Sequence, residues 1–181
     1  RNQQRLEDLT QSLANRAQAS VVALADVEAA ITNADIVIVA TNTPTAIIDV
    51  AKLKPGTVIC DISRPRNVPE ESTLLRQDVL VLDGGIVRPP GNPDFHFSFG
   101  LPPGLAYACM AETMILTLEG RYESYSLGGA VDVPKVQEIA ELGRKHGFAL
   151  AGFRSFEREV SEQQLERVRE ARTKSLASKT S

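Results

Sequence analysis

The sequence has 2 cysteines, which are far apart and do not form a CxxC pair. This pattern disfavours a disulfide or zinc site and raises the question of whether one of the two is a reactive thiol. Cys109 lies in the apolar stretch LAYACMAETMILTLEG, whereas Cys60 lies inside the apolar run TVICDI. A cysteine thiolate is a strong nucleophile and a good leaving group. Cys109 is therefore a candidate for covalent chemistry, and Cys60, inside a predicted strand, is a core residue. The alternative is that Cys109 is also a small core residue, since free cysteine is among the most buried residue types.

Two further side chains are candidates for proton or cofactor chemistry. Glu112 follows Cys109 by one helical turn and is unusual in so apolar a stretch. Its alternative role is a buried carboxylate paired with Arg64, Arg66 or Arg88. His96 is one of 2 histidines and a candidate base, with a structural histidine as the alternative. An alkyl-binding lining opposite the thiol is predicted from six side chains: Phe95, Phe97, Phe99, Leu101, Met110 and Met114.

Small and polar residues follow three apolar runs that have the composition of strands. In open parallel sheets, ligands bind beyond the carboxyl ends of the strands. Small side chains there let the backbone approach a nucleotide, and polar ones bind its ribose. We therefore predict a nucleotide site, with plain turns as the alternative. Its candidate residues are Thr41, Asn42, Thr43 and Pro44 after the first run, Arg66 after the second, and Gly84 and Gly85 after the third.

The glycine-rich motif GxGxxG that cradles a pyrophosphate does not occur after any strand of this sequence. A complete dinucleotide-binding domain is therefore not predicted. If Arg1 follows an upstream second strand, it stands where a residue distinguishes the ribose 2′-hydroxyl from the 2′-phosphate, and an arginine there favours NADP. The alternative is a surface arginine.

The elements that must position these residues indicate an α/β fold. A helix is predicted over 2–15, a strand over 21–24 and a short helix capped by Asp26. The β-branched run 36–40, the run 57–62 and the run 79–83 are typical of strands covered on both faces in a parallel sheet. The alternation predicts the carboxyl-terminal portion of a doubly wound, Rossmann-like NADP-binding domain, with its first strand and glycine-rich loop absent.

The second half of the sequence begins with a long loop, rich in proline and aromatic residues, that ends near residue 104. The stretch 105–119 is apolar on nearly every side, which predicts a buried helix with Cys109 more than one turn inside it. An amphipathic helix is predicted over 133–145, with Gly147 just beyond its end. The segment 154–181 is rich in charged residues and is predicted to be a solvated helix or a disordered tail.

Composition excludes several function classes. The chain has 181 residues, is 43% hydrophobic and carries a formal net charge of −3, which disfavours nucleic acid and anionic membranes as partners. Neither a transmembrane stretch nor a signal peptide occurs in the sequence, so we expect a cytoplasmic protein without a membrane span.

The motifs RNQQRLEDL, ADIVIVATNTP, VLDGG, LAYACMAETMILTLEG and RKHGF resemble the aldehyde-forming long-chain acyl-[acyl-carrier-protein] reductases over roughly residues 1–150. The strand-end pattern is also similar to the NADP domain of shikimate/quinate dehydrogenases and glutamyl-tRNA reductases. The resemblance implies NADPH-dependent reduction of a fatty acyl thioester to an aldehyde, through an acyl group on Cys109. The resemblance implies that residues 1–153 are a partial NADP-binding and acyl-thioester reductase domain and that residues 154–181 are a charged tail. The expected thioester donor is acyl carrier protein or acyl-coenzyme A.

Two alternatives remain at this stage. The first is a dehydrogenase of the shikimate/quinate type, in which hydride moves to or from a carbonyl without covalent catalysis. The second is a non-catalytic α/β module that binds a partner. The sequence gives neither the acyl chain length nor the oligomeric state.

Overall fold

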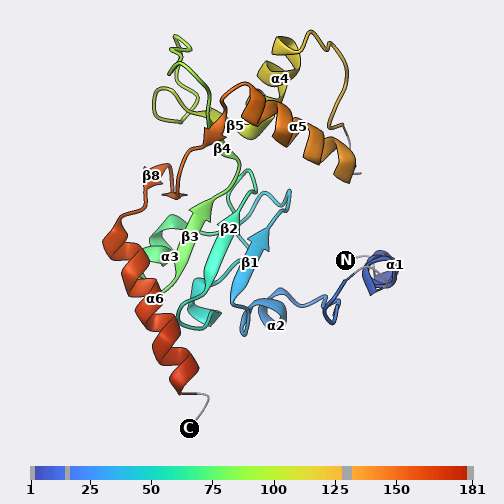
Figure 1. The fold of residues 1–181 in the computed structure, drawn as a ribbon. Coiled ribbons are helices and arrows are strands. Elements are labelled where there is room, and N and C mark those ends of the chain that lie inside the picture. Colours follow the sequence, from blue (N-terminus) through green and yellow to red (C-terminus); the bar gives the residue numbers. More distant parts are fainter. Residues whose placement is uncertain (1–2, 15–16, 128–131, 179–181) are drawn as a thin grey trace. The chain divides into compact units, whose positions relative to one another are not determined.

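The computed structural model describes residues 3–14, 17–127 and 132–178 (Figure 1). The chain forms two compact units. The first unit joins the chain up to Val81 with the carboxyl-terminal segment from Ser161 onward, and the second comprises Leu82–Val160. The predicted residue Arg1 lies outside the described residues.

A three-stranded sheet forms the centre of the first unit, with strand order β1-β2-β3. The strands are β1 (Ile36–Val39), β2 (Val58–Asp61) and β3 (Leu80–Asp83). β1 and β2 run parallel, with Ile36 opposite Val58 and Val39 opposite Asp61. The three predicted strand runs and the α/β class are therefore confirmed.

β1 is buried on one face only, which corrects the expectation of two covered faces. Val37 and Val39 are buried, whereas Ile36 is 66% and Ile38 71% exposed. Successive side chains of a strand point to opposite faces, so Ile36 and Ile38 share the uncovered face.

The described residues of the first unit form five helices: α1 (Gln3–Ala14), α2 (Val27–Ile31), the 3₁₀ helix η1 (Val50–Lys52), α3 (Glu70–Leu75) and α6 (Glu162–Ala177). Asp26 caps α2 as predicted, because its carboxylate accepts the Glu28 N–H at 3.0 Å. The predicted strand at 21–24 is wrong. This segment forms no ladder with another strand, and its apolar side chains Val22 and Leu24 are exposed.

The charged tail segment forms helix α6, which packs on the first unit. Val168 is only 4% exposed, and Arg172 Nη1 lies 3.7 Å from Asp35 Oδ1. A Cβ atom at Gly56 would lie 2.4 Å from the Cβ of Arg172, so only a glycine leaves room for α6 at this turn. The helical alternative of the prediction therefore holds for Glu162–Ala177, whereas residues 154–159, predicted as part of the same tail, form two short paired strands.

The second unit contains a small antiparallel sheet with strand order β5-β4-β6 and two long helices. The strands are β4 (Ile86–Arg88), β5 (Ala106–Tyr107) and β6 (Ala149–Leu150), and the helices are α4 (Ala108–Leu118) and α5 (Val133–Lys145). A hairpin of β7 (Arg154–Ser155) and β8 (Arg158–Glu159) follows. Ile86, Leu105 and Ala151 form a buried cluster. Gly147 has a φ of +80° just beyond α5, as a helix-ending glycine requires.

Candidate active site

Cys109 lies in the first turn of α4, not deep within a buried helix. Ala106 and Tyr107 pair with β4, so the helix begins only at Ala108 and Cys109 is its second residue. The Ala108 N–H donates to the carbonyl oxygen of Gly85 at 2.7 Å, which fixes the start of the helix. Cys109 is exposed, whereas Cys60 is half-buried in β2. The predicted burial of Cys109 is therefore wrong, because strand pairing takes the residues expected to form the first helical turn.

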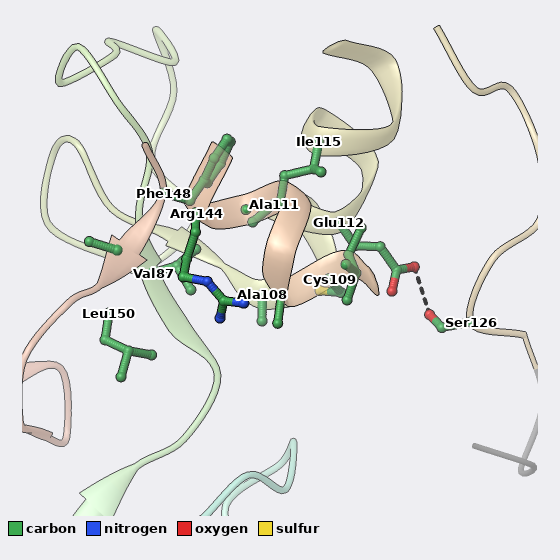
Figure 2. A pocket seen from close by; sticks show the side chains of 14 residues that line it. Val87, Ala108, Cys109, Ala111, Glu112, Ile115, Ser126, Arg144, Phe148 and Leu150 are labelled. Atoms are coloured by element: carbon green, nitrogen blue, oxygen red, sulfur yellow. Dashed lines mark hydrogen bonds between the residues drawn. The ribbon is translucent and has the colours of Figure 1, made fainter. Parts of the chain in front are cut away.

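Cys109 lines a pocket of about 800 Å³ in the second unit (Figure 2). α4 and α5 form one part of its wall and the small sheet forms another. The apolar lining includes Ala111 and Ile115 of α4, Ile139 and Ala140 of α5, Val87 of β4 and Leu150 of β6. Its volume lies within the range of small-molecule sites, and its lining is mostly apolar.

The phenylalanines of the long loop do not line this pocket, which corrects the predicted lining. Phe95 and Phe97 both pack on Phe99, with ring centroids 5.4 Å and 5.3 Å apart, and the Phe99 ring lies 6.2 Å from that of Tyr107. The three phenylalanines and Leu101 line a separate hollow of about 260 Å³. The alkyl-sized space beside the thiol comes from α5 and β6 instead.

Glu112 lines the same pocket as Cys109 and is held by Ser126. The Ser126 hydroxyl donates to Glu112 Oε1 at 2.7 Å, and Figure 2 shows this bond at the edge of the pocket. Among the described residues, the Glu112 carboxylate thus has a serine partner and not the arginine partner that the alternative predicted.

The segment that carries Ser126 is anchored to α5 through Tyr125. The Tyr125 hydroxyl donates to Glu138 Oε2 at 2.5 Å, and Arg121 donates to Glu138 Oε1 at 2.7 Å. Burial, and then the bond to the Glu138 carboxylate, raise the pKa of Tyr125 to about 12. Tyr125 therefore stays protonated and keeps Ser126 within reach of Glu112.

Arg144 is the lining residue that the sequence analysis missed. It belongs to the last turn of α5, one turn after Ala140 on the pocket face of that helix. The spacing of Ile139, Ala140, Gly143 and Arg144 follows a helical face, which is the signal that could have identified it.

His96 lies apart from the pocket lining. Its side chain is 86% exposed, and its Nδ1 lies 3.4 Å from Asp94 Oδ2. Its backbone N–H donates to Asp94 Oδ1 at 2.8 Å, so the pair forms a local turn in the long loop. The structure thus brings together Cys109 and Glu112 but not His96.

Gly84 and Gly85 connect β3 with β4. Gly85 has a φ of +73°, which favours glycine, and its carbonyl oxygen is the acceptor at the start of α4. These glycines lie in the second unit with Cys109, whereas residues 41–44 and Arg66 belong to the first unit.

The polar residues at the end of β1 form a network around Asn67, which is fully buried. The hydroxyls of Thr41 and Thr43 donate to Asn67 Oδ1 at 2.9 Å and 2.8 Å. Asn42 and Pro44, between and after the two threonines, are exposed, and Arg66 is half-buried. The network holds the backbone of the strand end and leaves the Asn42 amide to face solvent.

Asp61, which the sequence analysis did not single out, organises the loop after β2. It is 1% exposed, and its carboxylate accepts the N–H groups of Ser63 at 2.9 Å, Asn67 at 2.8 Å and Val68 at 3.2 Å. The signal for it was a carboxylate directly at the end of an apolar strand. Asp61 therefore positions Asn67 and, through it, Thr41 and Thr43.

Two kinds of feature do not occur in the described part of the chain. No group of three or more His, Cys, Asp or Glu side chains is placed to hold a metal ion there. None of the described helices combines the length and the hydropathy needed for a bilayer span.

Residues 1–83 match the family model described as shikimate / quinate 5-dehydrogenase. The match extends from the amino terminus through β3 and ends before the pocket that contains Cys109. Together with the parallel sheet, it supports the predicted fold class, a partial Rossmann-like NADP-binding domain.

Two curated proteins are similar over longer parts of the chain. Over 132 residues, 70% of this chain, it is 33% identical to aminotransferase PigE of Serratia sp., of which the match covers 15%. Over 154 residues, 82% of this chain, it is 30% identical to the long-chain acyl-[acyl-carrier-protein] reductase of Synechococcus elongatus, of which the match covers 43%. The chain therefore spans less than half the length of these curated relatives.

Proposed function

We propose that this chain belongs to an NADPH-dependent oxidoreductase that reduces a fatty acyl thioester to an aldehyde. The observation that carries the proposal is the exposed thiol of Cys109 at the start of α4, in an apolar pocket of about 800 Å³. The similarity to an acyl-[acyl-carrier-protein] reductase, over 82% of the chain, supports the substrate class.

Cys109 and the pocket have complementary tasks in this reaction. The thiolate attacks the thioester carbonyl and holds the acyl group as a new thioester, which is then reduced and released. The apolar walls can hold the alkyl chain next to the thiol. Glu112, fixed by Ser126, lies at the polar edge of the pocket, where it can accept or supply a proton.

The residues at the strand ends fit a nicotinamide cofactor by their chemistry. The exposed Asn42 amide offers both a donor and an acceptor beyond the carboxyl end of β1, where ligands bind in such sheets. Thr41 and Thr43 fix the backbone on both sides of it, and Arg66 supplies a positive charge for a phosphate. Bound NADPH would supply the hydride. Arg1 remains a proposed contact to its 2′-phosphate.

The thioester donor in this proposal is acyl carrier protein or acyl-coenzyme A. A chain of −3 formal charge does not by itself distinguish the two.

A second function follows from the family match of residues 1–83, which names shikimate / quinate 5-dehydrogenase. In a dehydrogenase of that type, hydride would pass directly between the cofactor and a ring carbonyl, and Cys109 would have no covalent role. The two functions differ in whether the thiol is required.

The decisive test is aldehyde formation by the native full-length polypeptide from an acyl thioester and NADPH. Cys109→Ser should abolish it, because a neutral hydroxyl attacks poorly and is a worse leaving group than a thiolate. Cys60→Ser, the matched control, should keep it, and reduction of free aldehyde to alcohol, if present, should survive in both variants. Full thioester reduction by Cys109→Ser would overturn the proposal and favour direct hydride transfer.

A further inference from the structure

Among the described residues, one charged group that lines the pocket beside Cys109 has no protein partner. Of its two charged lining residues, Glu112 accepts a hydrogen bond from Ser126. The guanidinium of Arg144 forms no hydrogen bond or ion pair with any residue that the structure describes, whereas the neighbouring Lys145 pairs with Glu119 at 2.6 Å. Arg144 is therefore free to bind a ligand.

The helix packing directs Arg144 into the pocket. Figure 2 shows its guanidinium extending from α5 toward Ala108, the residue before Cys109. Gly143 is buried where α5 packs on α4, and even a Cβ atom there would make only ordinary van der Waals contact with Ile115 Cδ1, at 3.5 Å. This packing holds the backbone from which the Arg144 side chain extends.

A guanidinium beside apolar walls matches a ligand with an alkyl chain and an oxygen-bearing end. Arginine presents five N–H donors in a planar fork and stays charged, so it binds carbonyl, carboxylate or oxyanion oxygens strongly. We propose that Arg144 binds the acyl oxygen of the substrate and holds the carbonyl against Cys109. This inference rests on the proposed function and assigns its oxygen-binding residue.

The role of Arg144 follows from the electron flow of acyl transfer. The Cys109 sulfur forms a bond to the carbonyl carbon, and the C=O electron pair moves onto the oxygen, where the Arg144 charge stabilises it. When the C=O bond forms again, the bond to the donor sulfur breaks, and the donor leaves as a thiolate that takes up a proton. Nothing is oxidised or reduced in this step, so it needs no cofactor.

The test measures the rate at which Cys109 is acylated in the native full-length polypeptide, followed by intact mass and peptide mapping. The probe is the decanoyl thioester of N-acetylcysteamine, which has no phosphate and therefore isolates the acyl oxygen. Arg144→Met should acylate about 100-fold more slowly, the typical effect of removing one oxyanion donor. Arg144→Lys should fall between, because it keeps the charge but loses the planar fork. The matched control, Arg169→Met, removes an exposed arginine that pairs with Glu166 on α6 and should have no effect.

Two measurements separate oxygen binding from other roles. Alkylation of Cys109 by iodoacetamide should proceed equally in all variants, since that reagent needs no oxyanion. If Arg144→Met slows alkylation as much as acylation, or slows acylation only by decanoyl-coenzyme A, then Arg144 acts on the thiol or on a donor phosphate and the inference is wrong.

Failure of the proposed function would be visible separately. If neither thioester acylates the wild-type protein, covalent catalysis is refuted. The role of Arg144 in oxygen binding is then tested by measuring the affinity for decanoate. Decanoate should then bind at least tenfold more weakly to Arg144→Met, while decanol binds both proteins equally. Equal decanoate affinities would overturn the assignment of Arg144.

Discussion

Replacing Asp61 with asparagine should destabilise the sheet edge that carries the proposed nucleotide site. The carboxylate accepts three backbone N–H groups, one through Oδ1 and two through Oδ2. An asparagine has one acceptor oxygen, so at least one of the N–H groups of Ser63, Asn67 and Val68 would face an NH₂ group instead. Because the site is 1% exposed, water does not replace the lost bond.

The size of the effect follows from these three bonds. A hydrogen bond to a charged group contributes about 1.5 to 3 kcal/mol, and a buried donor without a partner costs about 1 to 3 kcal/mol. Losing one bond and weakening two others should lower the free energy of unfolding by about 2 to 4 kcal/mol. With a urea m-value of roughly 2 kcal/mol/M, the midpoint would fall by about 1 to 2 M.

The assay is urea unfolding of the 181-residue chain, followed by circular dichroism, with amide exchange of Asn67 and Val68 as a local readout. Asp26→Asn is the matched control, because Asp26 also accepts a backbone N–H but is exposed, and asparagine caps helices equally well. Its unfolding midpoint should be unchanged. A loss below about 1 kcal/mol for Asp61→Asn, with unchanged amide protection, would refute the role assigned to this carboxylate.

Three further outcomes are expected. The 181-residue chain alone should bind NADPH more weakly than micromolar by calorimetry, because its sequence has no glycine-rich pyrophosphate loop; micromolar affinity would contradict this. Hydrogen bonds from Lys145 and then from His146 lower the pKa of Glu119 below its ordinary 4.5. The Tm difference between wild type and Glu119→Gln should therefore be full above about pH 4.5 and shrink as the pH falls through the lowered pKa. A Tm difference that does not change with pH would count against the pairing. Val168→Ala should cost about 1 to 2 kcal/mol in urea unfolding because two buried methyl groups are lost from α6, and an unchanged midpoint would show that α6 is not packed.

The sequence predicted the sheet well and the pocket poorly. The β-branched runs that became β1, β2 and β3 are local signals, and so is the Asp26 cap. The segment 21–24 has the same composition, but a strand also needs a neighbouring strand, and no local pattern reports one. The same limit applies to the uncovered face of β1, where Ile36 and Ile38 are exposed.

The position of Cys109 illustrates why the site was harder to predict. An apolar stretch from 105 to 119 favours one continuous helix, but pairing of Ala106 and Tyr107 with β4 delays its start to Ala108. This nonlocal pairing moves Cys109 to the first turn and exposes it. The helical spacing places Arg144 on the same face of α5 as Ala140, but that this face lines the pocket follows only from how α5 packs against α4.

The central claim is that Cys109 carries the acyl group, and trapping the acyl-enzyme tests it most directly. The native full-length polypeptide is incubated with a decanoyl thioester in the absence of NADPH, so that any acyl-enzyme accumulates, and is then analysed by intact mass and peptide mapping. The account predicts one decanoyl adduct per chain, on the peptide that contains Cys109. An adduct on Cys60, or no adduct under conditions in which iodoacetamide labels Cys109, would contradict it.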